Sequence, residues 1–193
     1  KKIKKFEVWD DKDKYTFNNY RAKDLKKSLA GVDFIVLSPG ISLLQNKNLL
    51  KFKEKIITDI DLFYLTNNKS RSIVVTGTNG KSTTCKLLAH LLKTNKKSFS
   101  LGGNIGAPIL SLNNKRKNFV IIEASSFQLA HSKFIKPDFA FFLNLTNDHL
   151  DWHGNMKNYL NSKLKIFQLQ SKSEYSILNN KFVKIFNRKK FLG

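Results

Sequence analysis

Residues 72–83 read SIVVTGTNGKST, and this stretch decides the fold of the whole chain. Its opening SIVVT is an apolar run without polar alternation, which is typical of a parallel strand buried on both faces. The glycine-rich turn after it leads into Lys81–Lys93, where leucines at helical spacing predict an amphipathic helix. The predicted apolar face of that helix consists of Leu87, Leu88, Leu91 and Leu92.

A strand, a glycine turn and a helix in this order predict a phosphate-binding loop. Glycines let backbone N–H groups close around phosphate oxygens, and the helix dipole adds partial positive charge. Lys81 is suited to reach the β- and γ-phosphates of a nucleotide, and the Ser82 hydroxyl to ligate Mg²⁺. The two glycines stand closer together than in the commonest such loop, where four residues separate them. The predicted cofactor-binding residues are Gly77, Thr78, Asn79, Gly80, Lys81, Ser82 and Thr83.

The rest of the chain alternates short apolar runs with amphipathic ones, which predicts an α/β fold with a right-handed parallel sheet. The polar stretch TNNKSR at 66–71 is typical of a linker between two units. Predicted strands are residues 6–9, 33–37, 56–57, 72–76, 98–101, 118–122, 138–145 and 175–178. Predicted helices are residues 24–30, 49–55, 60–65, 81–93, 107–112 and 155–169.

Glu123 directly follows the predicted strand 118–122, so it opens onto the sheet edge where ligands bind in α/β folds. Its carboxylate could bind the Mg²⁺ of a nucleotide or hold a water molecule on it. The alternative is a carboxylate that caps the N-terminus of the following helix.

His149 lies in NLTNDHLDWH, just beyond the predicted strand 138–145, and offers a neutral imidazole to a metal or a substrate. A structural histidine explains this residue alone equally well. His149 and His153 have the spacing of a zinc motif, but the glutamate of HExxH is absent, so a metalloprotease is not favoured. His153 has the weaker case and is expected at the surface.

Two weaker patterns accompany these motifs. The glycines of GGNIG (102–106) permit close backbone approach to a ligand, and the Asn104 amide can donate and accept hydrogen bonds, although an ordinary loop would look the same. Tyr159 and Lys163 share a helical face, but in so lysine-rich a chain a solvated lysine is the default expectation. Cys85 is expected to pack as a small apolar residue.

Composition limits the classes of function. The net charge of +21 favours polyanionic ligands such as nucleotides, but only four of the 35 basic residues are arginine, the residue that specific nucleic-acid readers use most. We therefore predict no nucleic-acid partner. The chain has no apolar run near the ~20 residues of a transmembrane helix, and its start, KKIKKFEVWDD, lacks the apolar core of a signal peptide. With one cysteine and no membrane segment, a cytoplasmic protein is expected.

Taken together, GTNGKST, GGNIG, EASSFQL, LTNDHLDWH and YLNSKLKIF resemble, in order and approximate spacing, the motifs of the Mur ligase family. These are ATP-dependent amide-forming enzymes of peptidoglycan synthesis, which serves cell shape and cell division. Within the family, SPGI (38–41), DIDLF (59–63) and SSFQL (125–129) resemble the branch that adds D-glutamate to UDP-N-acetylmuramoyl-L-alanine. The resemblance covers residues 6–180 and implies ATP and Mg²⁺ as cofactors, an acyl-phosphate intermediate, small-molecule substrates and a cytoplasmic monomer.

The same resemblance implies a role for individual residues. Lys81, His149 and Lys163 match catalytic positions, with Lys81 on the γ-phosphate. Ser82 and Glu123 match the ligands of one Mg²⁺. His149 and Lys163 match those of a second metal, where Lys163 stands at the family's carbamylated lysine. The matching substrate-contacting positions are Asp10, Ser38, Gly40, Asn104, Ser125 and Tyr159.

The resemblance also implies a domain division. Residues 1–68 match part of an N-terminal UDP-binding Rossmann-like domain, and residues 69–193 match a central ATP-binding domain that lacks its C-terminal end. A chain of this extent is expected to be inactive alone. The alternatives are another Mur-type or folylpolyglutamate-type ligase, and a non-ligase P-loop ATPase, which needs a Walker-B aspartate where this chain has Glu123.

Overall fold

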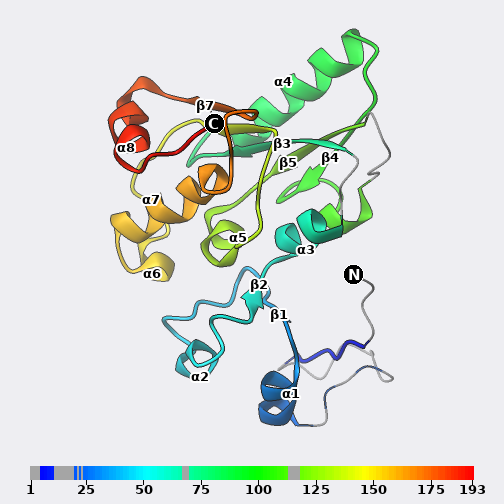
Figure 1. Ribbon diagram of the computed structural model, residues 1–193, viewed down its shortest axis with the longest axis vertical. Coiled ribbons are helices and arrows are strands. Elements are labelled where there is room, and N and C mark those ends of the chain that lie inside the picture. The colour runs from blue at the N-terminus through cyan, green and yellow to red at the C-terminus, as the bar shows by residue number, and fades with distance from the viewer. Residues whose placement is uncertain (1–4, 11–19, 21, 23, 67–69, 113–117) are drawn as a thin grey trace.

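The computed structural model describes residues 5–10, 20, 22, 24–66, 70–112 and 118–193 (Figure 1). Its larger part is a five-stranded sheet with helices on both faces, and a two-stranded sheet with short helices lies below it in the view of Figure 1. All strand pairs in both sheets are parallel. The predicted α/β fold with parallel sheets is confirmed.

The five-stranded sheet has the order β4-β5-β3-β6-β7, with β3 in the centre. Because all pairs are parallel, the five strands end at one edge, where Val75 pairs with Glu123 and Thr76 pairs with Phe142. The strands are β3 (Arg71–Thr76), β4 (Phe99–Gly103), β5 (Phe119–Glu123), β6 (Phe139–Phe142) and β7 (Tyr175–Leu178). The smaller sheet consists of β1 (Ile35–Val36) and β2 (Ile56–Ile57).

The predicted unit at 72–93 is confirmed: β3 is followed by the glycine turn, and α4 (Lys81–Thr94) begins at Lys81. The other helices are α1 (Leu25–Gly31), α2 (Lys47–Leu50), α3 (Asp59–Thr66), α5 (Ser126–His131), α6 (Leu150–His153), α7 (Met156–Leu164) and α8 (Val183–Arg188). Among the described residues, three 3₁₀ turns complete the elements: η1 (Ile109–Ser111), η2 (Lys165–Phe167) and η3 (Asn180–Phe182). Within the described residues, no helix is long and apolar enough to cross a membrane.

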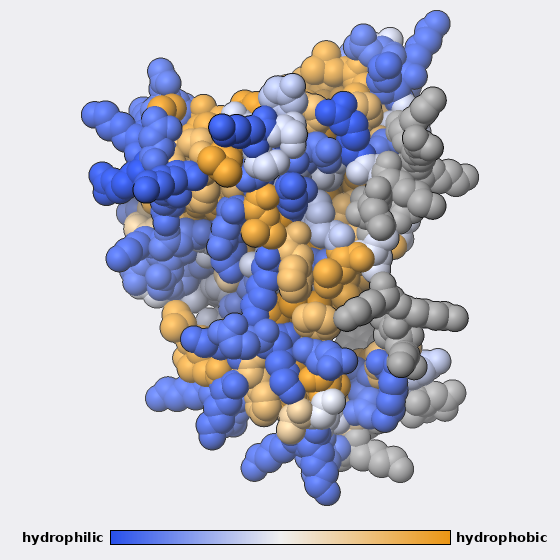
Figure 2. Space-filling model, viewed as in Figure 1, coloured by the Kyte–Doolittle hydropathy of each residue, from blue (hydrophilic) through white to orange (hydrophobic). Residues whose placement is uncertain are grey.

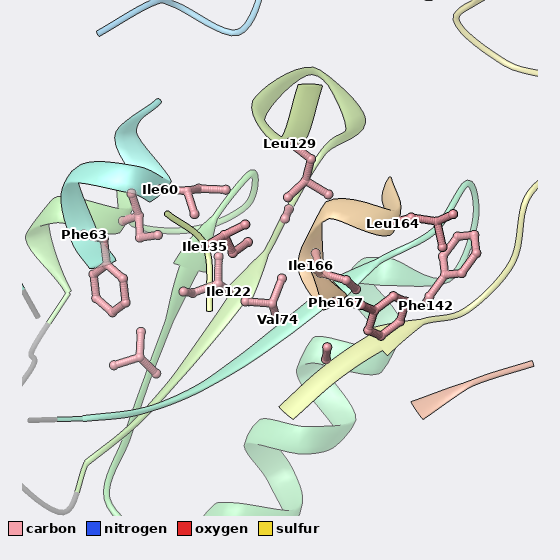
Figure 3. Close-up of a cluster of buried hydrophobic side chains, with 14 residues drawn as sticks. Ile60, Phe63, Val74, Ile122, Leu129, Ile135, Phe142, Leu164, Ile166 and Phe167 are labelled. Atoms are coloured by element: carbon pink, nitrogen blue, oxygen red, sulfur yellow. The ribbon is translucent and has the colours of Figure 1, made fainter. Parts of the chain in front are cut away.

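Both faces of the central strand are buried, as its unbroken apolar run predicts. Ile73 and Val75 pack against α4, and Val74 points to the other face because side chains alternate along a strand. Figure 3 shows this second core: Ile60 and Phe63 of α3 lie on one side of Val74, and side chains from α7 and η2 lie on the other.

Several local predictions are wrong. Residues 6–9 form no strand, because only Val8 makes a β-bridge, through backbone hydrogen bonds to Tyr20 and Ala22. In place of the helix predicted at 49–55, the short helix α2 ends at Leu50, and residues 51–55 form turns. Of the helix predicted at 107–112, only the 3₁₀ turn η1 forms after Pro108, which has extended backbone angles.

Only two of the four leucines predicted for the apolar face of α4 pack into the core. Leu88 and Leu92 pack into the core with Cys85 and Ala89, which gives the i, i+3, i+4, i+7 spacing of one helical stripe. Leu87 and Leu91 lie outside that stripe and are more than half exposed. Hydrophilic side chains project from both the upper and the lower part of the face seen in Figure 2.

A buried carboxylate joins α3 to the loop after α5. Asp61 is fully buried, and its Oδ1 accepts hydrogen bonds from Ser132 Oγ (2.6 Å) and from the backbone N–H groups of Lys133 and Phe134 (2.9 and 2.8 Å). Its Oδ2 accepts from the Thr58 N–H at 3.0 Å. Asp61 therefore fixes the helix that precedes β3 onto the larger sheet.

We expect Asp61→Ala to lower the free energy of unfolding by about 3 kcal/mol or more, because each buried donor left unpaired costs about 1–3 kcal/mol. Urea denaturation measures the change. The matched control is Asp33→Ala, since Asp33 is exposed and its removal should change stability by no more than about 0.5 kcal/mol. Equal stability of the two variants would contradict the role given to Asp61.

Candidate active site

The candidate site lies at the edge where the five strands end. The glycine loop 77–80 leaves β3 in the centre of the sheet, with the end of β5 on one side and the end of β6 on the other. Gly80 has φ +81°, a left-handed conformation that favours glycine. A Cβ on Gly77 would lie 3.1 Å from Leu143 Cβ, so this position is closely packed.

The first turn of α4 points its backbone N–H groups toward this edge, and the first N–H groups of an α-helix have no acceptor within the helix. The Lys81 ammonium folds back over the loop and donates to the carbonyl oxygens of Gly77 and Thr78, at 2.9 and 2.8 Å. Amides, the helix dipole and an ammonium together form an anion-binding arrangement.

Ser82, Glu123 and Asn104 meet beside the loop. Ser82 Oγ donates to Glu123 Oε2 at 2.7 Å, and Asn104 Nδ2 donates to Glu123 Oε1 at 2.9 Å. Glu123 does not cap the following helix, since Ser125 is the N-cap of α5, so that alternative is excluded. A hydroxyl beside a carboxylate is a donor set suited to a hard cation such as Mg²⁺.

Gly102 and Gly103 of GGNIG allow close contacts within the chain's own backbone. A Cβ on Gly102 would collide with the Ala107 carbonyl, and one on Gly103 would collide with the Glu123 carbonyl. The close approach that these glycines permit is therefore between β4, its following loop and β5, which sets Asn104 next to Glu123.

Asn144 is a residue whose role the sequence did not indicate. Its Oδ1 accepts from the Asn79 N–H at 2.9 Å, and its Nδ2 donates to the Asn79 carbonyl at 3.0 Å. Its own carbonyl accepts from the Thr78 N–H at 3.1 Å. The loop is thus tied to the segment that follows β6.

Lys163 also contacts the loop, and its side chain is buried, not solvated as expected. Its ammonium donates to the Gly77 carbonyl at 2.8 Å, and it stands 4.6 Å from the centre of the Tyr159 ring. Burial, and then the charge of Lys81, lower the pKa of Lys163 to about 7. Tyr159 is buried as well, and its hydroxyl lies 3.0 Å from Thr78 Oγ1.

His149 is exposed at the start of α6, with a left-handed backbone at φ +52°. Its Nε2 lies 3.3 Å from Asp148 Oδ2. The ring lies against Phe127, with centroids 4.6 Å apart, and 6.3 Å from the ring centre of Tyr159. A non-glycine residue held in this backbone region is often found at functional sites.

His153, expected at the surface, is buried, which corrects that prediction. Its Nε2 lies 3.0 Å from Ser126 Oγ and its Nδ1 lies 3.4 Å from Ser162 Oγ, so the ring bridges α5 and α7. It also stacks on Phe127, with an interplanar angle of 5°. Burial, and then the charge of Lys163, lower the pKa of His153 to about 4.

The remaining predicted residues lie in different surroundings. Ser125 forms a capping box with Gln128: its Oγ accepts from the Gln128 N–H, and the Gln128 side chain accepts from the Ser125 N–H. Ser38 and Gly40 are exposed in a turn, where the Gly40 carbonyl accepts from Trp152 Nε1 at 3.4 Å. Asp10 is exposed near the N-terminus.

No group of three or more His, Cys, Asp or Glu side chains suited to a metal ion occurs among the residues that the structure describes. The predicted metal ligands instead mix residue types. Ser82 is hydrogen-bonded to Glu123, whereas Lys163 is hydrogen-bonded to the Gly77 carbonyl and lies beside the Tyr159 ring. The second-metal assignment of His149 and Lys163 stays a prediction.

Comparison with known proteins gives this site a context. A family model described as "Mur ligase middle domain" matches residues 75–191. The chain therefore belongs to the Mur ligase family.

Two curated relatives share the name "UDP-N-acetylmuramoylalanine--D-glutamate ligase". The one from Rickettsia bellii is 43% identical over 150 residues, and the one from Natranaerobius thermophilus is 36% identical over 162 residues. These alignments cover 77% and 78% of this chain but 33% and 35% of the relatives. The chain spans about a third of the length of the curated relatives it matches.

Solved structures show the same fold. A MurF ligase from Thermotoga maritima, described in complex with ADP, has a TM-score of 0.53 and 25% identity, over 70% of this chain and 37% of that one. A ligase from Neisseria meningitides named for UDP-N-acetylmuramate and an L-alanyl-gamma-D-glutamyl-meso-diaminopimelate peptide has a TM-score of 0.54 and 16% identity, over 85% and 57% of the two chains.

The lowered pKa of His153 predicts acid sensitivity. The unfolded chain protonates this histidine below pH 6.5, whereas the folded chain protonates it only near pH 4. Stability contributed by neutral His153 is therefore lost as the pH falls from 6.5 to 4, by up to about 1.4 kcal/mol for each pH unit.

Urea denaturation at several pH values tests this expectation in His153→Gln, which should show a shallower loss of stability than the unmodified chain. The control is His90→Gln, because His90 is exposed on α4, and its slope should match that of the unmodified chain. An unchanged slope in His153→Gln would contradict the assignment.

Proposed function

We propose that this chain provides the ATP-binding part of a cytoplasmic ligase that adds D-glutamate to UDP-N-acetylmuramoyl-L-alanine in peptidoglycan synthesis. The observation that carries this proposal is the phosphate loop flanked by Ser82–Glu123 and Lys163, in a chain 36–43% identical to ligases named for that reaction. The single cysteine agrees with a reducing compartment.

The proposed reaction has two steps. The substrate carboxylate attacks the γ-phosphorus of ATP, the bond to the β-phosphate oxygen breaks, and an acyl phosphate and ADP form. The neutral amine of D-glutamate then attacks the acyl carbon, and the tetrahedral intermediate loses one N–H proton and expels phosphate, which carries that proton away and leaves the amide. In such phosphoryl transfers the protein acts chiefly through positioning and charge neutralisation. Lys81, released from the Gly77 and Thr78 carbonyls, would neutralise the γ-phosphate.

Ser82 and Glu123 would hold Mg²⁺ at the β- and γ-phosphates, and His149 with a modified Lys163 would hold a second metal ion. When bound, such ions neutralise the charge of the phosphates and orient them. Glu123 already receives hydrogen bonds from Ser82 and Asn104, so its two oxygens are oriented before any ion binds.

Lys163 is suited to carbamylation. In this step the neutral amine attacks CO₂, a nitrogen–carbon bond forms, and one proton leaves to solvent, which gives an N-carboxylate. A pKa of about 7 leaves about half of the amine neutral at pH 7, against about 0.04% for an ordinary lysine. The product is an anion in place of a buried cation beside Lys81.

On the substrate side, we propose that Asn104, Ser125 and Tyr159 face the acyl group. Asp10, Ser38 and Gly40 would lie toward the UDP portion, in a unit that comprises residues 1–68, with residues 69–193 as the ATP-binding unit. The complete gene product is proposed to act as a monomer on small molecules, without nucleic-acid or membrane partners.

We expect Lys81→Ala to lower ligase turnover in the complete gene product about a hundredfold or more, because loss of one charge contact to the transferred phosphoryl group costs on the order of 3 kcal/mol. The assay measures phosphate release with UDP-N-acetylmuramoyl-L-alanine and a panel of amino acids, of which only D-glutamate should support turnover. The control Lys86→Ala removes an exposed lysine of the same helix and should retain activity. Near-normal turnover by Lys81→Ala, or equal use of other amino acids, would contradict the proposal.

Carbamylation can be detected directly. Carbon-13 NMR in ¹³C-bicarbonate should show a carbamate signal that is absent from Lys163→Met. The signal should grow as the pH rises through 7, since deprotonation of Lys163 limits the reaction. Lys157→Met, which removes an exposed lysine of the same helix, should leave the signal intact. A signal that persists in Lys163→Met would assign the carbamate elsewhere.

A further inference from the structure

We propose that Asn144 is the positioning residue that sets the phosphate loop in its anion-binding conformation, an inference that rests on the proposed nucleotide site. Asn144 lies two residues beyond the end of β6 and touches the loop through both its side chain and its backbone. In the described part of the chain no hydrogen bond joins Asn144 to Lys81 or to Ser82, so Asn144 would act through the loop alone.

The side chain of Asn144 pairs with both backbone polar groups of Asn79. Its Oδ1 accepts from the Asn79 N–H at 2.9 Å while its Nδ2 donates to the Asn79 carbonyl at 3.0 Å. A carboxamide carries a donor and an acceptor on one planar group, whereas a carboxylate only accepts. Asparagine is therefore the residue of this size that can satisfy both groups of the Asn79 residue at once.

Two neighbouring contacts extend this pairing. The Asn144 carbonyl accepts from the Thr78 N–H at 3.1 Å, and Thr78 Oγ1 accepts from the Thr146 N–H at 3.1 Å. The N–H groups of Thr78 and Asn79 are thus used to anchor the loop. The first turn of α4 keeps backbone N–H groups that have no acceptor within the helix and can meet an anion.

Thr78 also connects the loop to the segment that leads to His149 and to Tyr159 of α7. The segment 144–149 ends at His149, and Thr78 also reaches the Tyr159 hydroxyl at 3.0 Å. The loop and this segment therefore form one hydrogen-bonded unit. Loss of the Asn144 pairing would let the loop adopt other conformations, and an anion would have to order it at a cost in affinity.

The test is ADP binding by the complete gene product, measured by calorimetry in the unmodified protein and in Asn144→Ala and Asn144→Asp. We expect ADP affinity to fall about tenfold or more in Asn144→Ala, since a tenfold change corresponds to about 1.4 kcal/mol, the worth of one or two hydrogen bonds. Asn144→Asp should lose more, because it sets a negative charge against the Asn79 carbonyl and beside the phosphates. Higher salt should restore part of that extra loss.

The ranking of the two variants separates positioning from a purely structural role, because aspartate keeps the volume and one acceptor and would be the milder change for packing. Asn147→Ala is the matched control, since Asn147 is an exposed asparagine of the same segment, and its affinity should equal that of the unmodified protein. If Asn144→Ala does not fold, Asn144→Ser is measured in its place with the same expectation.

Unchanged ADP affinity in the Asn144 variants, with tight binding by the unmodified protein, would overturn this inference and leave the proposed function standing. Failure of the unmodified protein to bind ADP would overturn the proposed nucleotide site and this inference with it.

Discussion

The parallel pairing of β3 with both of its neighbours is the constraint on which the candidate site depends. A strand in the centre of a parallel sheet ends between two other strand ends, so the chain that leaves it as a loop has a neighbour on each side. Here Glu123 comes from β5 and Asn144 from the segment after β6, and neither needs a long excursion to reach the loop. The same edge is where ligands bind in open α/β sheets.

Charge is the second constraint. The Gly77 carbonyl accepts hydrogen bonds from two ammonium groups, those of Lys81 and Lys163. Burial, and then repulsion by the charge of Lys81 at the same acceptor, lower the pKa of Lys163. An anion at the loop would relieve that repulsion. The fold therefore keeps two ammonium groups close together, which is electrostatically unfavourable. A bound phosphate group would offset that cost, and such losses of stability are common at functional sites.

Features that one local stretch of sequence determines could be predicted, and features that depend on packing between separate segments could not. The loop, its strand and its helix follow from one local stretch, and parallel strand ends brought Ser82 and Glu123 together as expected. The burial of His153 and Lys163 depends on packing between α5, α6 and α7, which neighbouring residues do not reveal. Likewise, the helical spacing of Leu87 and Leu91 does not reveal which side of α4 faces the sheet. The position of the sheet decides this, and Cys85 and Ala89 face it in place of those leucines.

Two of the motifs that resemble the D-glutamate branch are in direct contact, although 69 positions separate them. The Asp59 carboxylate accepts from Gln128 Nε2 at 3.2 Å, and Gln128 Oε1 accepts from the Ser125 N–H at 3.1 Å. Burial raises the pKa of Asp59, so its charged form depends on such partners. Replacement of Gln128 would take this partner from the partly buried Asp59 carboxylate, and replacement of Asp59 would take it from Gln128 Nε2, which is costly. DIDLF and SSFQL are therefore one hydrogen-bonded unit, and through the capping box at Ser125 that unit sets where α5 begins beside Glu123.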